Sequence, residues 1–367
     1  MSKPMKNSYT PDFVLPPGAT LKEVLAERGM TQAELARRMG RPQKTISEII
    51  NGKAELTPET AQQLELVLCI PASFWNNLER NYREWEARER EADHLKTQVD
   101  WLKSVPVNKL KKMGWVQPYK EPVEQLRAVL QFFGVASPQQ WNDVWGTTAV
   151  AYCKSFAVEQ DTFAIAAWLC QGKIEAQEIQ CARYDERTFR MALTKIRTLT
   201  VEPPEVFKPD LVRLCAEAGV AVVFLPCPPG TGISGAATWL GPHKALVMLS
   251  LRFKSDDHLW FTFFHEAGHI LLHTKQETFV DIKSEERGQE EEMEEQANKF
   301  SADWLIPSAE WRRFVMSGQK SKIALRQFAN SVEISPGIVV GRMQTEGHLP
   351  HSHCNDLKQR FVWVQDC

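Results

Sequence analysis

Apolar positions recur at helical spacing over most of the chain. From Gly18 to about Arg90 the pattern predicts short helices joined by tight loops, without the alternation typical of strands. Between about residues 105 and 200 the pattern is helical again. The many aromatic side chains in that region are typical of helix–helix packing.

The pattern changes at about residue 205. Three short apolar runs at 219–226, 232–240 and 245–251 are punctuated by Gly and Pro, and they predict three short strands. Helices are expected to follow at about 256–273, 289–305 and 321–332. Strands followed by helices favour a small α+β domain over a doubly wound sheet.

A chain of 367 residues is too long for one typical core, so we expect a multidomain protein. The pattern predicts an all-α N-terminal domain at 18–92, an α-helical linker or spacer region at 93–204, an α+β domain at 205–345 and a C-terminal tail at 346–367. Nothing in the sequence assigns chemistry to the region 93–204.

The composition is that of an ordinary globular protein, with 43% hydrophobic and 25% charged residues and a net charge of −2. These values disfavour disorder and collagen-like repeats. The first thirteen residues lack the apolar segment of a signal peptide, and no run approaches the length of a membrane span. The eight cysteines form no CxxC pair. We therefore expect a reduced protein of the cytoplasm.

The strongest chemical signal is the segment FTFFHEAGHILLH in the predicted helix 256–273. His265 and His269 are four residues apart, so they project from one helix face and can share a metal ion. Glu266 can lie beside the metal's water and take its proton. Zinc suits two neutral imidazoles plus a carboxylate, with the fourth position open for water, although manganese or iron could occupy the same ligands. The next predicted helix offers carboxylates in its acidic first part: Glu290, Glu291, Glu292, Glu294 and Glu295.

Residues 233–307 resemble the ImmA/IrrE family of bacterial zinc metallopeptidases. The matching pieces are ISGAATWL, LSLR, DDHLWFTFFHEAGHILLH and ExxAxxFSADWLIP. The resemblance implies a zincin-like fold, one zinc ion per chain and peptide-bond hydrolysis with Glu266 as the base. It also implies Glu294 as the third ligand, with Glu295 as the alternative. His273 matches a family histidine that supports the site or simply packs.

Two further points bear on the peptidase prediction. Metzincins have a third His six residues after the second, and this chain has Lys275 there, so that class is excluded. The edge strand of the ImmA/IrrE family is thought to bind substrate backbone by strand addition, and GISGAATWL is the matching segment. The competing explanation, that its glycines only allow a tight turn, stays open. His243 and His258 are candidates for stabilising an oxyanion by position alone, and an ordinary surface role is favoured for each.

A second motif, MTQAELARRMGRPQKTISEIINGK, predicts two short helices separated by a tight turn. Thr31 is placed to cap the first helix, with Glu34 at the offset of a capping box, and Gly40 lies at the turn. The segment resembles the Cro/cI-type (XRE) helix-turn-helix. Through residues 58–90 the resemblance continues to antitoxins of the HigA type.

The helix-turn-helix resemblance implies that the second helix enters the major groove of an operator in double-stranded DNA. It implies base contacts from Gln43, Lys44, Thr45 and Glu48. It implies phosphate contacts from Gln32, Arg41, Asn51 and Lys53. The alternative is a helical hairpin whose arginines are merely solvated. Dimerisation is usual for such readers, so a homodimer is possible.

Four potential ligands lie close together near the C-terminus, in the sequence HLPHSHC: His348, His351, His353 and Cys354. Such ligands could bind a transition metal. A solvated loop is the favoured interpretation.

Two functions follow. The first is a DNA-binding regulator with a zinc endopeptidase that cleaves a regulatory protein, either a helix-turn-helix repressor or the chain itself in the linker at about 93–110, under stress, phage or toxin–antitoxin cues. The second is a HigA-like antitoxin and autorepressor that binds a RelE-type toxin, with the peptidase fold as a sensing or interaction module. Glu266 favours the first, because a site that only binds zinc needs no base.

Overall fold

The computed structural model describes residues 14–146, 161–273 and 287–363, and of 287–290 the backbone alone. The chain divides into two compact units, Met1–Val99 and Asp100–Cys367. Each unit is described by itself. The predicted domain limits at 92, 204 and 345 remain predictions.

The first unit is a bundle of five helices among its described residues. These are α1 (Pro17–Glu27), α2 (Gln32–Met39), α3 (Gln43–Ile50), α4 (Pro58–Leu68) and α5 (Ala72–Lys96). Its core is formed by one apolar stripe from each helix, including Leu21, Leu35, Ile46, Leu64 and Trp75. The all-α character predicted for this part of the chain is confirmed.

The turn between α2 and α3 has the predicted chemistry. Thr31 Oγ1 accepts a hydrogen bond from the backbone N–H of Glu34 (3.1 Å) and so caps the start of α2. Gly40 ends α2 with a φ of 65°, a left-handed conformation that glycine adopts without a steric penalty. Gly18 allows α1 to meet the end of α3, because a Cβ there would lie 2.2 Å from the carbonyl oxygen of Ile49.

Along the chain, the second unit begins and ends with helices, and the three strands of its sheet come between these two groups of helices. The 3₁₀ turn η1 (Val99–Lys103) precedes the first group, which comprises α6 (Val107–Lys112), α7 (Pro122–Phe133), α8 (Pro138–Trp141), the π-helical turn η2 (Asn142–Gly146), α10 (Thr162–Glu178), α11 (Glu186–Thr198), the 3₁₀ turn η3 (Leu199–Val201) and α12 (Pro204–Glu217). The last group comprises α13 (Asp256–Leu272), α14 (Arg287–Leu305), α15 (Ser308–Met316), α16 (Lys322–Ser331), α17 (Pro336–Thr345) and the 3₁₀ turn η4 (Asn355–Leu357). The helices expected at 256–273, 289–305 and 321–332 are therefore confirmed.

In the described part of the chain the sheet has three strands, β1 (Val220–Phe224), β2 (Gly235–Gly241) and β3 (Lys244–Leu249), in the order β1-β3-β2. β1 pairs with β3 in parallel, and β2 pairs with β3 antiparallel. All three predicted strands are present, and the α+β class is confirmed. The central position of β3 leaves β2 at an edge of the sheet.

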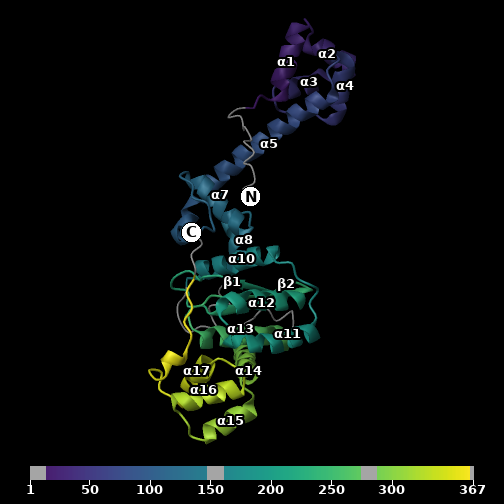
Figure 1. Ribbon diagram of the computed structural model, residues 1–367. Coiled ribbons are helices and arrows are strands. Elements are labelled where there is room, and N and C mark those ends of the chain that lie inside the picture. The colour runs from purple at the N-terminus through teal and green to yellow at the C-terminus, as the bar shows by residue number, and fades with distance from the viewer. Residues whose placement is uncertain (1–13, 147–160, 274–286, 364–367) are drawn as a thin grey trace. The chain divides into compact units, whose positions relative to one another are not determined.

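Helices cover both faces of this sheet. Alternate residues such as Val222 and Val247 point into a core shared with α11, α12 and α13. Their neighbours, such as Val223 and Met248, point into a second core shared with α7 and α10. Figure 1 shows α10 on one side of the strands and α12 and α13 on the other. Helices of the region 100–200 thus pack on the same sheet as α13, the helix with the HExxH motif.

The segment after α17 is fixed to this unit. Arg360 forms an antiparallel bridge with Ser255, directly before α13. Phe361 is buried and packs against Phe207 of α12, with 5.6 Å between the ring centroids. His351 and His353 of the histidine-rich loop are exposed. Leu349, Leu357 and Phe361 thus join the core of the second unit, and the rest of the segment 346–363 lies on its surface or partly buried.

Among the described residues, none of the helices combines the length and the apolar character needed to cross a bilayer.

Candidate metal centre

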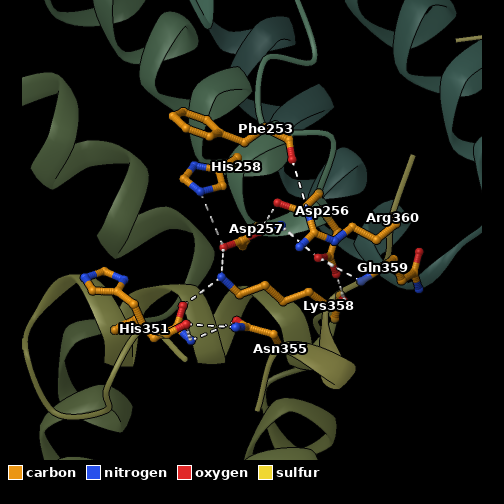
Figure 2. A network of polar contacts seen from close by, with 12 residues as sticks. Phe253, Asp256, Asp257, His258, His351, Asn355, Lys358, Gln359 and Arg360 are labelled. Atoms are coloured by element: carbon orange, nitrogen blue, oxygen red, sulfur yellow. Dashed lines mark hydrogen bonds and ion pairs between the residues drawn. The ribbon is translucent and has the colours of Figure 1, made fainter. Parts of the chain in front are cut away.

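The helix that carries the HExxH motif is anchored at its N-terminus by a buried polar network (Figure 2). Asp257 forms an ion pair with Lys358 of the C-terminal segment (2.6 Å), and both side chains are less than 10% exposed. Asp256 accepts hydrogen bonds from Ser335 Oγ and from the backbone N–H of Gln359. Carboxylates at a helix N-terminus also interact favourably with the helix dipole. These contacts fix the start of α13 and hence the positions of its histidines.

α13 packs against α14 at a glycine. A Cβ at Gly268 would lie 3.4 Å from the Cα of Ala297 and 3.1 Å from Phe300, so the two helices can approach closely only with a very small residue at 268. Ser301 Oγ donates to the carbonyl oxygen of Phe261 (2.8 Å) and ties the helices together one turn further on. This crossing brings the first half of α14 over the HExxH turn.

His265, His269 and Glu294 converge at this crossing. The Nε2 atoms of the two histidines lie 3.0 Å apart. The carboxylate of Glu294 lies 3.3 Å from Nε2 of His265 and 3.4 Å from Nε2 of His269. Within the described residues, this is the one group of three or more His, Cys, Asp or Glu side chains whose ligand atoms all lie within 4.8 Å of one another.

The spacing of these atoms suits a tetrahedral zinc ion. Zinc–nitrogen bonds of about 2.0–2.1 Å place two ligands of a tetrahedron roughly 3.3–3.4 Å apart. The separations of 3.0 to 3.4 Å lie close to that value. Two imidazole nitrogens and a carboxylate that converge in this way favour a shared cation, because the carboxylate and the nitrogen lone pairs attract positive charge. The donor set therefore fits the zinc ion that the sequence implies.

Both histidines are oriented by a partner on their other ring nitrogen. Nδ1 of His265 lies 3.0 Å from Oδ1 of Asn298, one turn after Glu294 on α14. An amide oxygen can only accept, so His265 donates from Nδ1, and its Nε2 atom is directed at Glu294 and His269. Nδ1 of His269 lies 3.0 Å from Nδ1 of His273. Such contacts fix the tautomer of a metal ligand.

Glu266 lies beneath the edge strand of the sheet. Its side chain is buried, and a Cβ at Gly235 of β2 would lie 2.8 Å from its Oε1 atom. Burial raises the pKa of Glu266, although the neighbouring His265 and His269 oppose that shift. A raised pKa moves a carboxylate towards the range in which it can accept and return a proton near neutral pH.

The two carboxylates considered as third ligand occupy different positions. Burial opposes ionisation of Glu294, but hydrogen bonds from His265 and His269 hold the pKa of that carboxyl well below its ordinary value. The pKa of His265 is raised, because its contact with Glu294 outweighs the opposing effect of burial. Glu295 is exposed, lies outside the triad and lines a cavity between α13, α14 and α17. The geometry thus favours Glu294, as the family resemblance implied.

The two histidines considered for an oxyanion lie outside this triad. His258 stacks on Phe253, with 4.1 Å between the rings, and lies 4.0 Å from Asp257. His243 lies in the turn between β2 and β3, and its carbonyl oxygen accepts from the backbone N–H of Tyr184. Their roles remain predictions.

The predicted DNA contacts gather around α3. Gln43 and Lys44 begin the helix and are exposed, and Asn51 and Lys53 lie exposed directly after it. Gln32, Arg41, Thr45 and Glu48 are half-buried.

Several of these side chains already have partners within the first unit. Lys44 and Glu48 form an exposed pair (3.8 Å) on one helix face. Arg41 donates to Oε1 of Gln63, and Asn51 donates to the carbonyl oxygen of Ser47 (2.7 Å). A reader of DNA would exchange or extend these contacts on binding.

Asn298 and the Asp257–Lys358 pair escaped the sequence analysis. Asn298 has a signal that could have identified it: it lies four residues after Glu294, so both side chains face α13. Lys358 has none, because about a hundred residues separate it from Asp257 in the chain.

Comparisons with known proteins agree with both motifs. Residues 21–75 match the family described as Helix-turn-helix, and residues 215–344 match the family described as IrrE N-terminal-like domain. The Escherichia coli (strain K12) HTH-type transcriptional regulator YddM is 37% identical over 71 residues, which cover 19% of this chain and 76% of that protein.

Two solved structures are also similar. One is an antidote protein of an addiction module, of the HigA family, from Coxiella burnetii, at 25% identity, covering 23% of this chain and 91% of that one, with a TM-score of 0.21. The other, from Nostoc punctiforme, is assigned as an antidote of a plasmid maintenance system, at 25% identity, covering 23% and 92%, with a TM-score of 0.23. TM-scores this low do not establish a shared fold or function, so the antitoxin alternative stays a prediction.

The two family matches together span most of both predicted functional regions, and the expected fusion of a DNA reader with an ImmA/IrrE-like domain is confirmed. The chain belongs to the helix-turn-helix transcriptional regulators of the XRE type and carries a domain of the IrrE N-terminal-like peptidase family.

Proposed function

We propose that this regulator is a zinc-dependent endopeptidase that hydrolyses a peptide bond in a regulatory protein, a helix-turn-helix repressor or a copy of itself. The observation that carries the proposal is the convergence of His265, His269 and Glu294 beside the buried Glu266. A site that only bound zinc would not require a buried carboxylate next to its ligands.

The ligand residues have defined tasks in this proposal. His265 and His269 would bind zinc through Nε2, and Glu294 through its carboxylate. When bound, zinc would supply a Lewis acid that polarises the scissile carbonyl and lowers the pKa of water towards neutrality. Asn298 and His273 would hold the two imidazoles in the required tautomer.

Glu266 would act as the general base and then as the general acid of the reaction. Its carboxylate would accept a proton from the attacking water and deliver it to the nitrogen of the leaving amine. Burial raises the pKa of Glu266, which suits a group that must both accept and return a proton.

Strand β2 would position the substrate. It lies at an edge of the sheet in the described residues, and Gly235 in this strand is directly next to Glu266. An extended polypeptide that pairs with this edge would run along β2, and one of its backbone carbonyls would then lie near Glu266. Side-chain pockets would then select the sequence.

Cleavage of the chain itself has one structural requirement. Val105 and Leu110, in the candidate linker at about 93–110, are buried in the core of the second unit. A bond there would become accessible only after local opening. A partner repressor with an exposed linker would meet no such barrier, so we favour cleavage of a second protein.

The experiment compares the wild type with Glu266→Gln, each with equimolar zinc and each after chelation. A panel of helix-turn-helix repressors from the same cell is incubated with these proteins, and intact masses are recorded. We expect fragments only with zinc-loaded wild type. Zinc-loaded wild type that cleaves neither the panel nor itself, while holding one zinc ion, would argue against proteolysis.

A further inference from the structure

A cavity of about 720 Å³ lies between α13, α14 and α17. Its walls include Phe261 of α13, Asn298 and Ala302 of α14, and Ile338 of α17. Pockets for small molecules typically measure about 300–1,000 Å³. The cavity is therefore large enough for a substantial ligand.

The cavity borders the candidate metal centre. Asn298 lines it and also accepts the hydrogen bond from Nδ1 of His265 (3.0 Å). The ring of Phe261 lines it too, with its centroid 6.3 Å from that of His265. A group held in this cavity would thus contact two side chains that touch a metal ligand.

Most charged groups around the cavity already have partners within the chain. Arg342 donates to the carbonyl oxygens of Ala302 (2.8 Å) and Ile306 (3.1 Å). Asp303 accepts a hydrogen bond from Ser308. Asp257 is paired with Lys358, as Figure 2 shows. These three groups are satisfied within the chain and do not call for a charged ligand.

Much of the lining that remains for an occupant is apolar. The Phe261 side chain is 38% exposed, although it lies on the central helix of the unit. Ala302, Leu305 and Ile338 add further apolar atoms to the cavity. Such a lining favours a bulky apolar group over a charged or small one.

We propose that this cavity is a specificity pocket that holds a bulky apolar side chain of the polypeptide substrate. The proposal rests on the proposed function, since the substrate must first reach the metal site. The pocket would give the enzyme a preference for aromatic or large aliphatic residues next to the scissile bond, which the HExxH motif alone does not determine.

The test uses small chelators on the full chain loaded with zinc. Acetylated amino-acid hydroxamates bind zinc through the hydroxamate group and carry one side chain, here that of alanine, leucine or phenylalanine. Their dissociation constants are measured by titration calorimetry. We expect the phenylalanine compound to bind roughly tenfold or more tightly than the alanine compound, because it buries a large apolar side chain.

Three variants locate this preference. Ala302→Trp places a bulky ring in the cavity and should reduce the difference between the compounds to less than about twofold. Gln296→Trp adds the same bulk on an exposed position of α14 that does not line the cavity, and should keep the difference. Phe261→Ala removes one wall and should weaken the preference, so the test holds even where Ala302→Trp fails to fold.

The outcomes separate the two proposals. Equal binding of all three hydroxamates to the wild type, or an unchanged preference in Ala302→Trp, overturns the pocket while the metal site stands. No binding of any hydroxamate to protein that holds zinc overturns the pocket as well. A chain that takes up no zinc overturns the metal site itself, and the pocket with it. Toluene is added as a free apolar molecule: if its binding depends on Ala302 while the hydroxamates show no preference, the cavity serves a small molecule and the substrate pocket is refuted.

Discussion

The Nδ1 atom of His265 lies 3.0 Å from the amide oxygen of Asn298, which projects from the neighbouring helix α14 one turn after Glu294. This contact joins the two helices of the site and directs the opposite nitrogen of His265 towards Glu294 and His269. Asn298 is therefore a positioning residue for the proposed metal centre.

Replacing Asn298 should weaken zinc binding without removing a ligand. For Asn298→Ala we expect a loss of about 10- to 100-fold in zinc affinity, the range for partners that orient a ligating histidine. Asn298→Asp keeps an acceptor and should retain most of the affinity. Competition with a chromophoric chelator measures both, and equal affinities for wild type and Asn298→Ala would contradict the assigned role.

The third ligand is tested by a pair of adjacent substitutions. Glu294→Gln should lower zinc affinity by at least about tenfold, because it removes a charged ligand of the ion. Glu295→Gln changes the same charge on the exposed neighbour and should leave the affinity unchanged. The zinc content of the two variants after dialysis, measured by elemental mass spectrometry, distinguishes the two ligand assignments. The reverse ranking would assign the ion to Glu295.

Gly235 on the edge strand should determine where the carboxylate of Glu266, the proposed base, can lie. An alanine Cβ there would lie 2.8 Å from Oε1 of Glu266 and 2.5 Å from Cγ2 of Thr262, so Glu266 must move. We expect Gly235→Ala to lower kcat by about 100-fold, as for a misplaced catalytic group, while zinc content is kept. Gly241→Ala, on the same strand with nothing within 4 Å of its Cβ, is the matched control. Full activity in Gly235→Ala would place the base elsewhere.

Asp256 predicts a pH dependence of stability. Its side chain is fully buried, and burial raises its pKa from 3.8 to about 6 despite the hydrogen bond from Ser335. The folded state then holds the proton more tightly than the unfolded state does. This contribution to stability is fully present below about pH 4 and is lost as the pH rises through about 6. Its size is about 2–3 kcal/mol from the shift of the pKa.

Asp256→Asn removes this titration and keeps an acceptor for the backbone N–H of Gln359. Urea unfolding of the metal-free chain should therefore show a shallower decline in stability between pH 4 and 6.5 for the variant. Asp210→Asn on α12, where the side chain is 42% exposed and pairs with Arg213, should leave the pH dependence of stability as in the wild type. Identical slopes for Asp256→Asn and wild type would mean that Asp256 ionises normally in the fold.

Much of the fold follows from local sequence. The HExxH spacing fixes two side chains on one helix face, and Thr31 and Gly40 set the ends of α2 through short-range geometry. The three strands were recognisable because Gly and Pro bound their apolar runs. Their order β1-β3-β2 was not, since pairing depends on contacts across the fold.

The surroundings of the site depend on those distant contacts. Asn298 acquires its role only when Gly268 lets α14 approach α13. Lys358 meets Asp257 from the other end of the domain, and no periodicity or motif links the two. The helices at 100–200 carry an apolar stripe that suits any helix partner, so the sequence could not show that they cover a face of the sheet.

The central claim is that Glu266 drives cleavage of a protein in the cell. Cells that produce either the wild type or Glu266→Gln at equal levels are compared by mass spectrometry of newly formed protein N-termini after stress. We predict at least one new N-terminus, in a helix-turn-helix repressor, that appears only with the wild type while the abundance of the intact repressor falls. Identical sets of N-termini in the two strains, with zinc bound in both proteins, would contradict the account.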